Sequence, residues 1–165
     1  MGNRHSRNLE ATKEIFFPFT GIGETQATSV ALGAHTGILV NANGEYAYGE
    51  GYIPWNFSHL VEGKIVLLSY ATLTPMNFRV VTDYCPPETA YFLHNSLKNI
   101  NVNTVLNRVQ EANIADALVD LTDSAPLEAE NYLGVQVSRQ VGQNTNALFL
   151  GVRIRYNTPI YAKAP

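Results

Sequence analysis

The stretch ALFLGVRIRY, residues 147–156, decides the fold class of this 165-residue chain. Apolar side chains recur at every second position along it. A period of two is the pattern of a β-strand with one buried face, because successive side chains of a strand point to opposite sides. We therefore predict a strand whose core face carries Leu148, Leu150, Val152, Ile154 and Tyr156.

The preceding segment NYLGVQVSRQV, residues 131–141, alternates in the same way, with Leu133, Val135 and Val137 on one face. The residues between the two segments, GQNTN, are typical of a turn. Two alternating segments on either side of such a turn predict a long antiparallel hairpin with one buried face.

The period of two extends over most of the chain. Further strands are expected at 14–20, 26–32, 36–40, 45–52, 64–71, 77–85 and 88–97, and NANG (41–44) resembles the turn of a hairpin. Residues 99–109 fit a strand or a helix; we expect a strand-like run, followed by one short helix within 111–121. Eight to ten short strands with one short helix predict an all-β fold, a single jelly roll or β-sandwich barrel.

The length fits one domain, which we expect to cover residues 13–165 behind a mobile polar arm at residues 1–12. A net charge of −3 argues against a protein that binds nucleic acid in bulk or by sequence, because no basic face is concentrated enough. The single cysteine, Cys85, excludes an intrachain disulfide. No apolar run is long enough to span a bilayer, and we expect no signal peptide. Gly2 and Ser6 fit the myristoylation pattern, and whether Gly2 is modified stays open.

No pattern of catalytic or metal-binding residues stands out. The four histidines lack second ligands at a metal-binding spacing, so we expect no metal and no cofactor. Cys85 with His94 is the one nucleophile–base pair to consider, and the acidic neighbours of Cys85 oppose activation of the thiol. GIGETQ (21–26) resembles a dinucleotide fingerprint but lacks its third glycine, and we interpret it as a turn. The protein is not expected to be an enzyme.

The stretch NGEYAYGEGYIPWNFS, residues 43–58, gathers aromatic residues and allows two interpretations. Tyr46, Tyr48, Tyr52 and Trp55 could form a platform that stacks on sugar rings beside Glu45 and Glu50. The alternative is that these aromatic side chains fill a barrel end or a subunit contact. The corner expected at Pro54–Trp55 predicts a buried Trp55 and favours packing over ligand binding.

Several features together resemble a small viral coat protein. These are low charge, abundant Asn, Thr and Ala, the short basic arm MGNRHSRN, and the paired segments of residues 131–159. Over most of residues 13–160 the chain resembles the single jelly-roll capsid proteins of tailless, membrane-containing phages and archaeal viruses. The resemblance is one of architecture and rests on no diagnostic motif.

The resemblance implies a capsid building block that associates with itself, at least as a dimer, and with a second capsid protein. It implies a location in the virion, assembly in the host cytoplasm, and a basic arm that contacts a membrane surface. Arg153 and Arg155, outward on the last strand, are candidate partners for carboxylates of a neighbouring subunit. They could equally be charges on an edge strand that discourage wrong strand pairing. The alternative function is a carbohydrate-binding β-sandwich module that uses exposed Tyr and Trp side chains.

Overall fold

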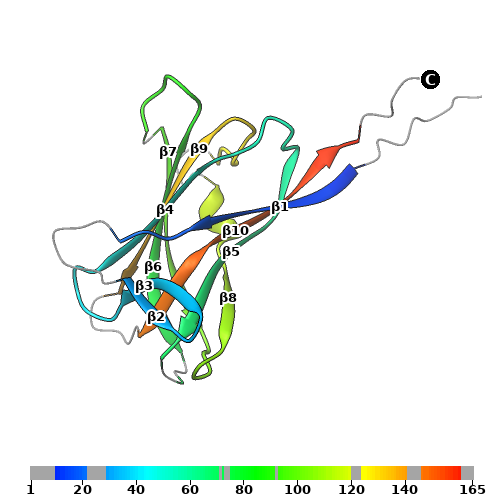
Figure 1. The fold of residues 1–165 in the computed structure, drawn as a ribbon. Coiled ribbons are helices and arrows are strands. Elements are labelled where there is room, and N and C mark those ends of the chain that lie inside the picture. The colour runs from blue at the N-terminus through cyan, green and yellow to red at the C-terminus, as the bar shows by residue number, and fades with distance from the viewer. Residues whose placement is uncertain are drawn as a thin grey trace, which may run out of the picture.

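A computed structural model describes residues 10–21, 29–70, 72, 75–91, 93–119, 124–140 and 146–160. Over these residues ten strands and one turn of 3₁₀ helix form two antiparallel sheets that pack face to face (Figure 1). The all-β prediction is confirmed.

Each sheet is named here by its strands. Sheet A has the order β2–β3–β10–β5–β8, with β1 also paired to β10, and comprises β1 (Glu10–Pro18), β2 (Ser29–Leu32), β3 (His35–Val40), β5 (His59–Ser69), β8 (Val109–Asn113) and β10 (Ala147–Pro159). Sheet B has the order β4–β9–β6–β7 and comprises β4 (Tyr46–Tyr52), β6 (Met76–Cys85), β7 (His94–Val102) and β9 (Tyr132–Arg139).

The path of the chain is that of a jelly roll. From β3 to β10 the chain changes sheet at every connection except that between β6 and β7. Strands β1 and β3 occupy the same side of β10, one along each half of its length. With β1 and β2 set aside, the four-stranded sets β3–β10–β5–β8 and β4–β9–β6–β7 have the strand order of a single jelly roll.

The predicted hairpin at 131–156 is wrong, although both of its strands exist. β9 pairs with β4 and β6 in sheet B, whereas β10 pairs with β1, β3 and β5 in sheet A. The turn expected at residues 41–44 likewise connects β3 in one sheet to β4 in the other. A period of two identifies the face that a strand buries, and two strands can bury those faces against one core from opposite sheets.

The predicted core face of β10 is also wrong over its first half. The register of β10 against β5 shifts between Phe149 and Gly151, as a β-bulge does. The core side of β10 therefore comprises Ala147, Phe149, Val152, Ile154 and Tyr156. Leu148 is fully buried, as expected, but outside this core cluster, and Leu150 is only partly buried. Gly151 follows this shift, and position 151 requires glycine because a Cβ there would meet the carbonyl oxygen of Phe17 at 2.4 Å.

The helix expected within 111–121 is a single turn, η1 (Ala115–Leu118), preceded by β8. Ala117 and Leu118 are buried on the core side. The Thr82 hydroxyl of β6 donates a hydrogen bond to the Ala117 carbonyl and so ties η1 to sheet B. The strand-like run expected at 99–109 is interrupted: β7 ends at Val102, β8 begins at Val109, and residues 103–108 connect them outside any strand.

The N-terminal boundary lies earlier than residue 13. β1 begins at Glu10 and pairs with the end of β10, so residues 10–12 belong to sheet A (Figure 1). Residues 1–9, with Gly2 and the basic side chains, lie outside the described residues. The same holds for residues 22–26 of the GIGETQ motif.

Candidate functional site

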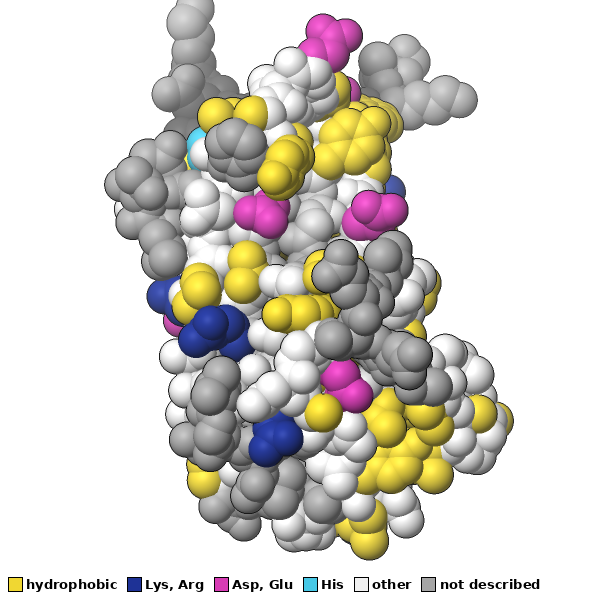
Figure 2. All heavy atoms as spheres, turned by 90° about the vertical axis from the view of Figure 1, so that its left-hand side faces the viewer, with side chains coloured by type: hydrophobic (Ala, Val, Ile, Leu, Met, Phe, Trp, Pro, Cys, Tyr) yellow, Lys and Arg dark blue, Asp and Glu magenta, His cyan; other side chains and the backbone are white. Residues whose placement is uncertain are grey.

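The outer face of sheet B, the side turned away from the core, gathers three of the aromatic residues predicted as a platform. Tyr46, Tyr48 and Tyr52 alternate on β4 with buried positions such as Ala47 and therefore project outward. Figure 2 shows this side of the molecule, with hydrophobic side chains and carboxylates in its upper half; most of the basic side chains lie lower down, together with a further hydrophobic patch and a carboxylate.

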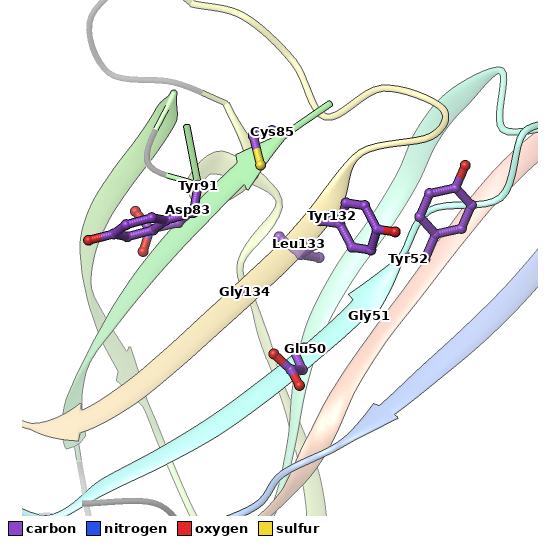
Figure 3. Close-up of a pocket in the computed structure, with 9 residues that line it drawn as sticks. All are labelled: Glu50, Gly51, Tyr52, Asp83, Cys85, Tyr91, Tyr132, Leu133 and Gly134. Carbon is purple, nitrogen blue, oxygen red and sulfur yellow. The ribbon is translucent and has the colours of Figure 1, made fainter. Parts of the chain in front are cut away.

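Two carboxylates flank a gap in the middle of this face. The strand register places Gly134 of β9 between Glu50 of β4 and Asp83 of β6 (Figure 3). Because Gly134 has no side chain, the surface is hollowed there into a groove of about 530 Å³. Burial raises the pKa of Asp83. Among the described residues, neither carboxylate forms a hydrogen bond or an ion pair.

Aromatic rings line one end of the groove. Tyr52 and Tyr132 lie side by side with ring centroids 5.2 Å apart, and they are 42% and 55% exposed. Tyr91 also lines this groove (Figure 3). Partial desolvation, and then the nearby Glu130 carboxylate and Tyr132, raise the pKa of Tyr52. The arrangement is an open, mostly apolar surface beside two acidic groups.

The prediction that Trp55 is buried is wrong. Its side chain is 67% exposed, in the connection between β4 and β5. The corner is closed instead by Ile53 and Phe57, which are both buried, and Phe57 stacks on Tyr156 of β10 at 5.3 Å. Since these two residues complete the core, the turn between them directs Trp55 to solvent.

The other half of the face is tyrosine-rich and basic. Tyr46 and Tyr48 are half-buried with ring centroids 6.0 Å apart, and the Gln136 side chain donates to the Tyr48 hydroxyl at 2.9 Å. A second hollow of about 280 Å³ lies beside Tyr46 and Arg79. Within the described part of the chain Arg79 forms no ion pair or side-chain hydrogen bond. Within the part of the chain that the structure describes, this face thus carries unpaired carboxylates beside the groove and an unpaired cation, Arg79, beside the smaller hollow.

Arg153 and Arg155 lie elsewhere, on the outer face of sheet A, and have partners within the chain. Arg153 contacts Glu111 at 2.7 Å and Glu62 at 3.5 Å, and Arg155 contacts Glu62 at 3.1 Å. A third carboxylate, Glu14, lies 3.7 Å from Arg153. The interpretation of these arginines as edge charges is wrong, because β10 lies inside sheet A.

The remaining candidate groups are not brought together. Cys85 lines the groove on the outer face of β6, whereas His94 stacks on Tyr84, whose ring is buried on the core side. Over the described ranges no cluster of three or more His, Cys, Asp or Glu side chains is arranged to hold a metal. No helix within those ranges is long and apolar enough to cross a membrane.

Comparison with known proteins gives only distant structural similarity. No protein-family model matches the chain, and no curated protein matches it. One similar structure is the CBM22-1–GH10 portion of endo-1,4-beta-D-xylanase 10B from Clostridium thermocellum, in complex with xylohexaose. It has 15% identity and a TM-score of 0.42 over 94% of this chain, which spans 27% of that chain's length. A chain of Desmodium yellow mottle tymovirus has 9% identity and a TM-score of 0.29, over 95% of this chain and 91% of that one.

Proposed function

We propose that this protein is a non-catalytic structural subunit of a virus particle that associates with itself through the outer face of sheet B. One observation carries the proposal. That face exposes tyrosine and aliphatic side chains together with Glu50, Asp83 and Arg79, which have no partner within the described chain. Tyr and Arg are enriched in protein–protein interfaces, and exposed apolar patches mark interaction surfaces.

The contrast between the two outer faces supports this choice of surface. On sheet A, Arg153 and Arg155 meet the carboxylates of Glu14, Glu62 and Glu111, so opposite charges are already paired. On sheet B the opposite charges lie apart along the strands. A surface with separated, unpaired charges gains ion pairs when a complementary surface covers it.

A shell subunit needs contacts weak enough to be reversible, so that misplaced copies can leave. Contacts of about 1,000 Å² in total meet this need. The low charged fraction of 15% fits a protein whose surface is partly covered by neighbours. A second capsid protein, a virion location, assembly in the host cytoplasm and contact of the basic arm with a membrane surface are further parts of the proposal.

A second candidate function is the binding of a neutral oligosaccharide, favoured by the groove itself. Tyr52 and Tyr132 offer ring faces on which a sugar can stack, and Glu50 and Asp83 can accept hydrogen bonds from its hydroxyl groups. Such a groove, apolar with a few polar groups, is typical of a small-molecule site.

Calorimetry separates the two functions. Diluting concentrated protein into buffer should absorb or release heat that follows a dissociation curve if copies associate. Injecting soluble hexasaccharides of xylose or glucose should give no binding heat. Saturable hexasaccharide heat, lost in Tyr52→Ala, with no heat of dilution, would instead establish the second function and overturn the first.

A further inference from the structure

We propose that two copies pack the outer faces of sheet B together about a twofold axis that crosses β6 at Val81, so that Asp83 of each copy pairs with Arg79 of the other. This inference rests on the proposed self-association and gives it a partner, a second copy of this chain, and a register. Its basis is the charge pattern of the face.

The symmetry follows from positions on one strand. Arg79, Val81 and Asp83 alternate with the buried Val80 and Thr82, so all three project from the outer face. A rotation of 180° about an axis that lies in the interface and crosses the strand at Val81 exchanges positions 79 and 83. The contact is then isologous: residue i meets residue j twice, as a C₂ dimer requires.

The charges on β6 cannot neutralise each other within one copy. Four residues of strand separate Asp83 from Arg79 by about 13 Å, which is too far for an ion pair. Neither has a partner in the described part of the chain. In the dimer both charges are paired, and the pair occurs twice. A charge-assisted bond between guanidinium and carboxylate is among the stronger polar contacts.

The neighbouring strands agree with the same axis. The register places Tyr48, Gln136, Val81 and Leu97 in one row across the sheet. In the dimer, each residue of this row lies opposite the same residue of the second copy. The contact therefore buries Val81 and also Leu97, which is 44% exposed in one copy. On β4, Tyr46 and Glu50 lie two positions to either side of Tyr48. The rotation therefore places Glu50 of one copy opposite Tyr46 of the other. A tyrosine hydroxyl is a suitable donor to a carboxylate.

The dimensions are compatible with a weak contact. β6 has ten residues, so the face is about 33 Å long, and its four strands span about 15 Å. The flat area is therefore about 500 Å² per copy, at the small end for protein interfaces. Facing sheets cross at about 30°, which displaces groups two residues from the axis by about 3 Å, within the reach of an arginine side chain.

Charge exchange in single chains and in mixtures tests the pairing. Asp83→Arg and Arg79→Asp each place like charges opposite one another at both contacts. Sedimentation velocity should therefore show at least tenfold weaker association of each variant alone. The double variant Asp83→Arg/Arg79→Asp should associate within about threefold of wild type. An equimolar mixture of the two single variants should also associate, because each supplies the charge that the other lacks.

The result separates the register from the proposed function. If wild type and every variant associate equally, the copies meet through another surface, and the register is overturned while self-association stands. If wild type stays monomeric at all concentrations, the proposed function fails and the register with it. Circular dichroism of each variant verifies folding. Lys13→Asp, a charge reversal at an exposed residue of β1 in sheet A, serves as the control that should leave association unchanged.

Discussion

Arg153 on β10 donates a 2.7 Å hydrogen bond to Glu111 on β8, although β5 lies between the two strands. The long side chain spans a neighbouring strand and, on its way, comes within 3.5 Å of Glu62 on β5. Glu14 of β1 lies 3.7 Å from Arg153, which therefore connects four strands of sheet A by charge, in addition to the backbone hydrogen bonds. This relationship assigns Arg153 to the stability of the subunit.

Replacing Arg153 by Met should destabilise the fold by about 1–3 kcal/mol, because Glu14, Glu62 and Glu111 would remain close together without their shared cation. Chemical denaturation monitored by circular dichroism measures the loss. In protein dilute enough to be monomeric, Arg79→Met is the matched control, since Arg79 is exposed and unpaired within the described residues; the stability of this variant should change by less than about 0.5 kcal/mol. Equal effects of the two substitutions would contradict the assignment.

Gly51→Ala should destabilise the fold by about 1–3 kcal/mol through overpacking. A Cβ on Gly51 would lie 2.0 Å from the ring of Phe17, which packs between β1 and β4. Gly134→Ala on the adjacent strand is the control, because its Cβ would meet only one atom within 4 Å, at 3.8 Å. Thermal unfolding of both variants decides the matter, and a Gly134 variant as unstable as the Gly51 variant would refute the packing explanation.

Trp55, the only tryptophan, should behave as a solvent-exposed fluorophore. In dilute protein its emission should lie near that of free tryptophan, and acrylamide should quench it with little protection. The sequence-based expectation of a buried Trp55 requires blue-shifted, protected emission, so one spectrum distinguishes the two.

Asp83 should make stability depend on pH in a defined direction. Burial raises the pKa of Asp83 in the folded state above its unfolded value of 3.8. At pH values between these two pKa values, the folded state therefore binds more protons than the unfolded state. This group's contribution to stability is therefore largest below pH 3.8 and is lost as pH rises through the folded pKa. In dilute protein, Asp83→Asn should gain stability relative to wild type over that rise. Urea titrations at several pH values would contradict this if the difference stayed constant.

The sequence predicts the all-β class well because a period of two survives in nearly every strand. The sequence does not predict which strands pair with each other. β9 and β10 are adjacent in sequence and separated by turn residues, yet they belong to different sheets. Only long-range pairing decides that choice, and the alternation of each strand is the same in either case.

The alternation of apolar residues does not predict the bulge in β10 or all residues of the candidate site, and each failure has a physical reason. The bulge before Gly151 reverses the faces of β10, so Phe149 enters the core where Leu148 and Leu150 were expected. A glycine inside a strand often marks a bulge, so Gly151 could have indicated this one. For the site, the sequence identified Tyr46, Tyr48 and Tyr52 but missed Asp83, Tyr132 and Arg79. They join the face only through the pairing of β9 with β4 and β6.

Light scattering from wild-type protein on a size-exclusion column, across concentration and salt, tests the central claim most directly. The account predicts a mass that rises from one subunit towards two or more as concentration increases, and that falls back at high salt because ion pairs are screened. A mass of one subunit at every concentration and salt would contradict self-association through the outer face of sheet B.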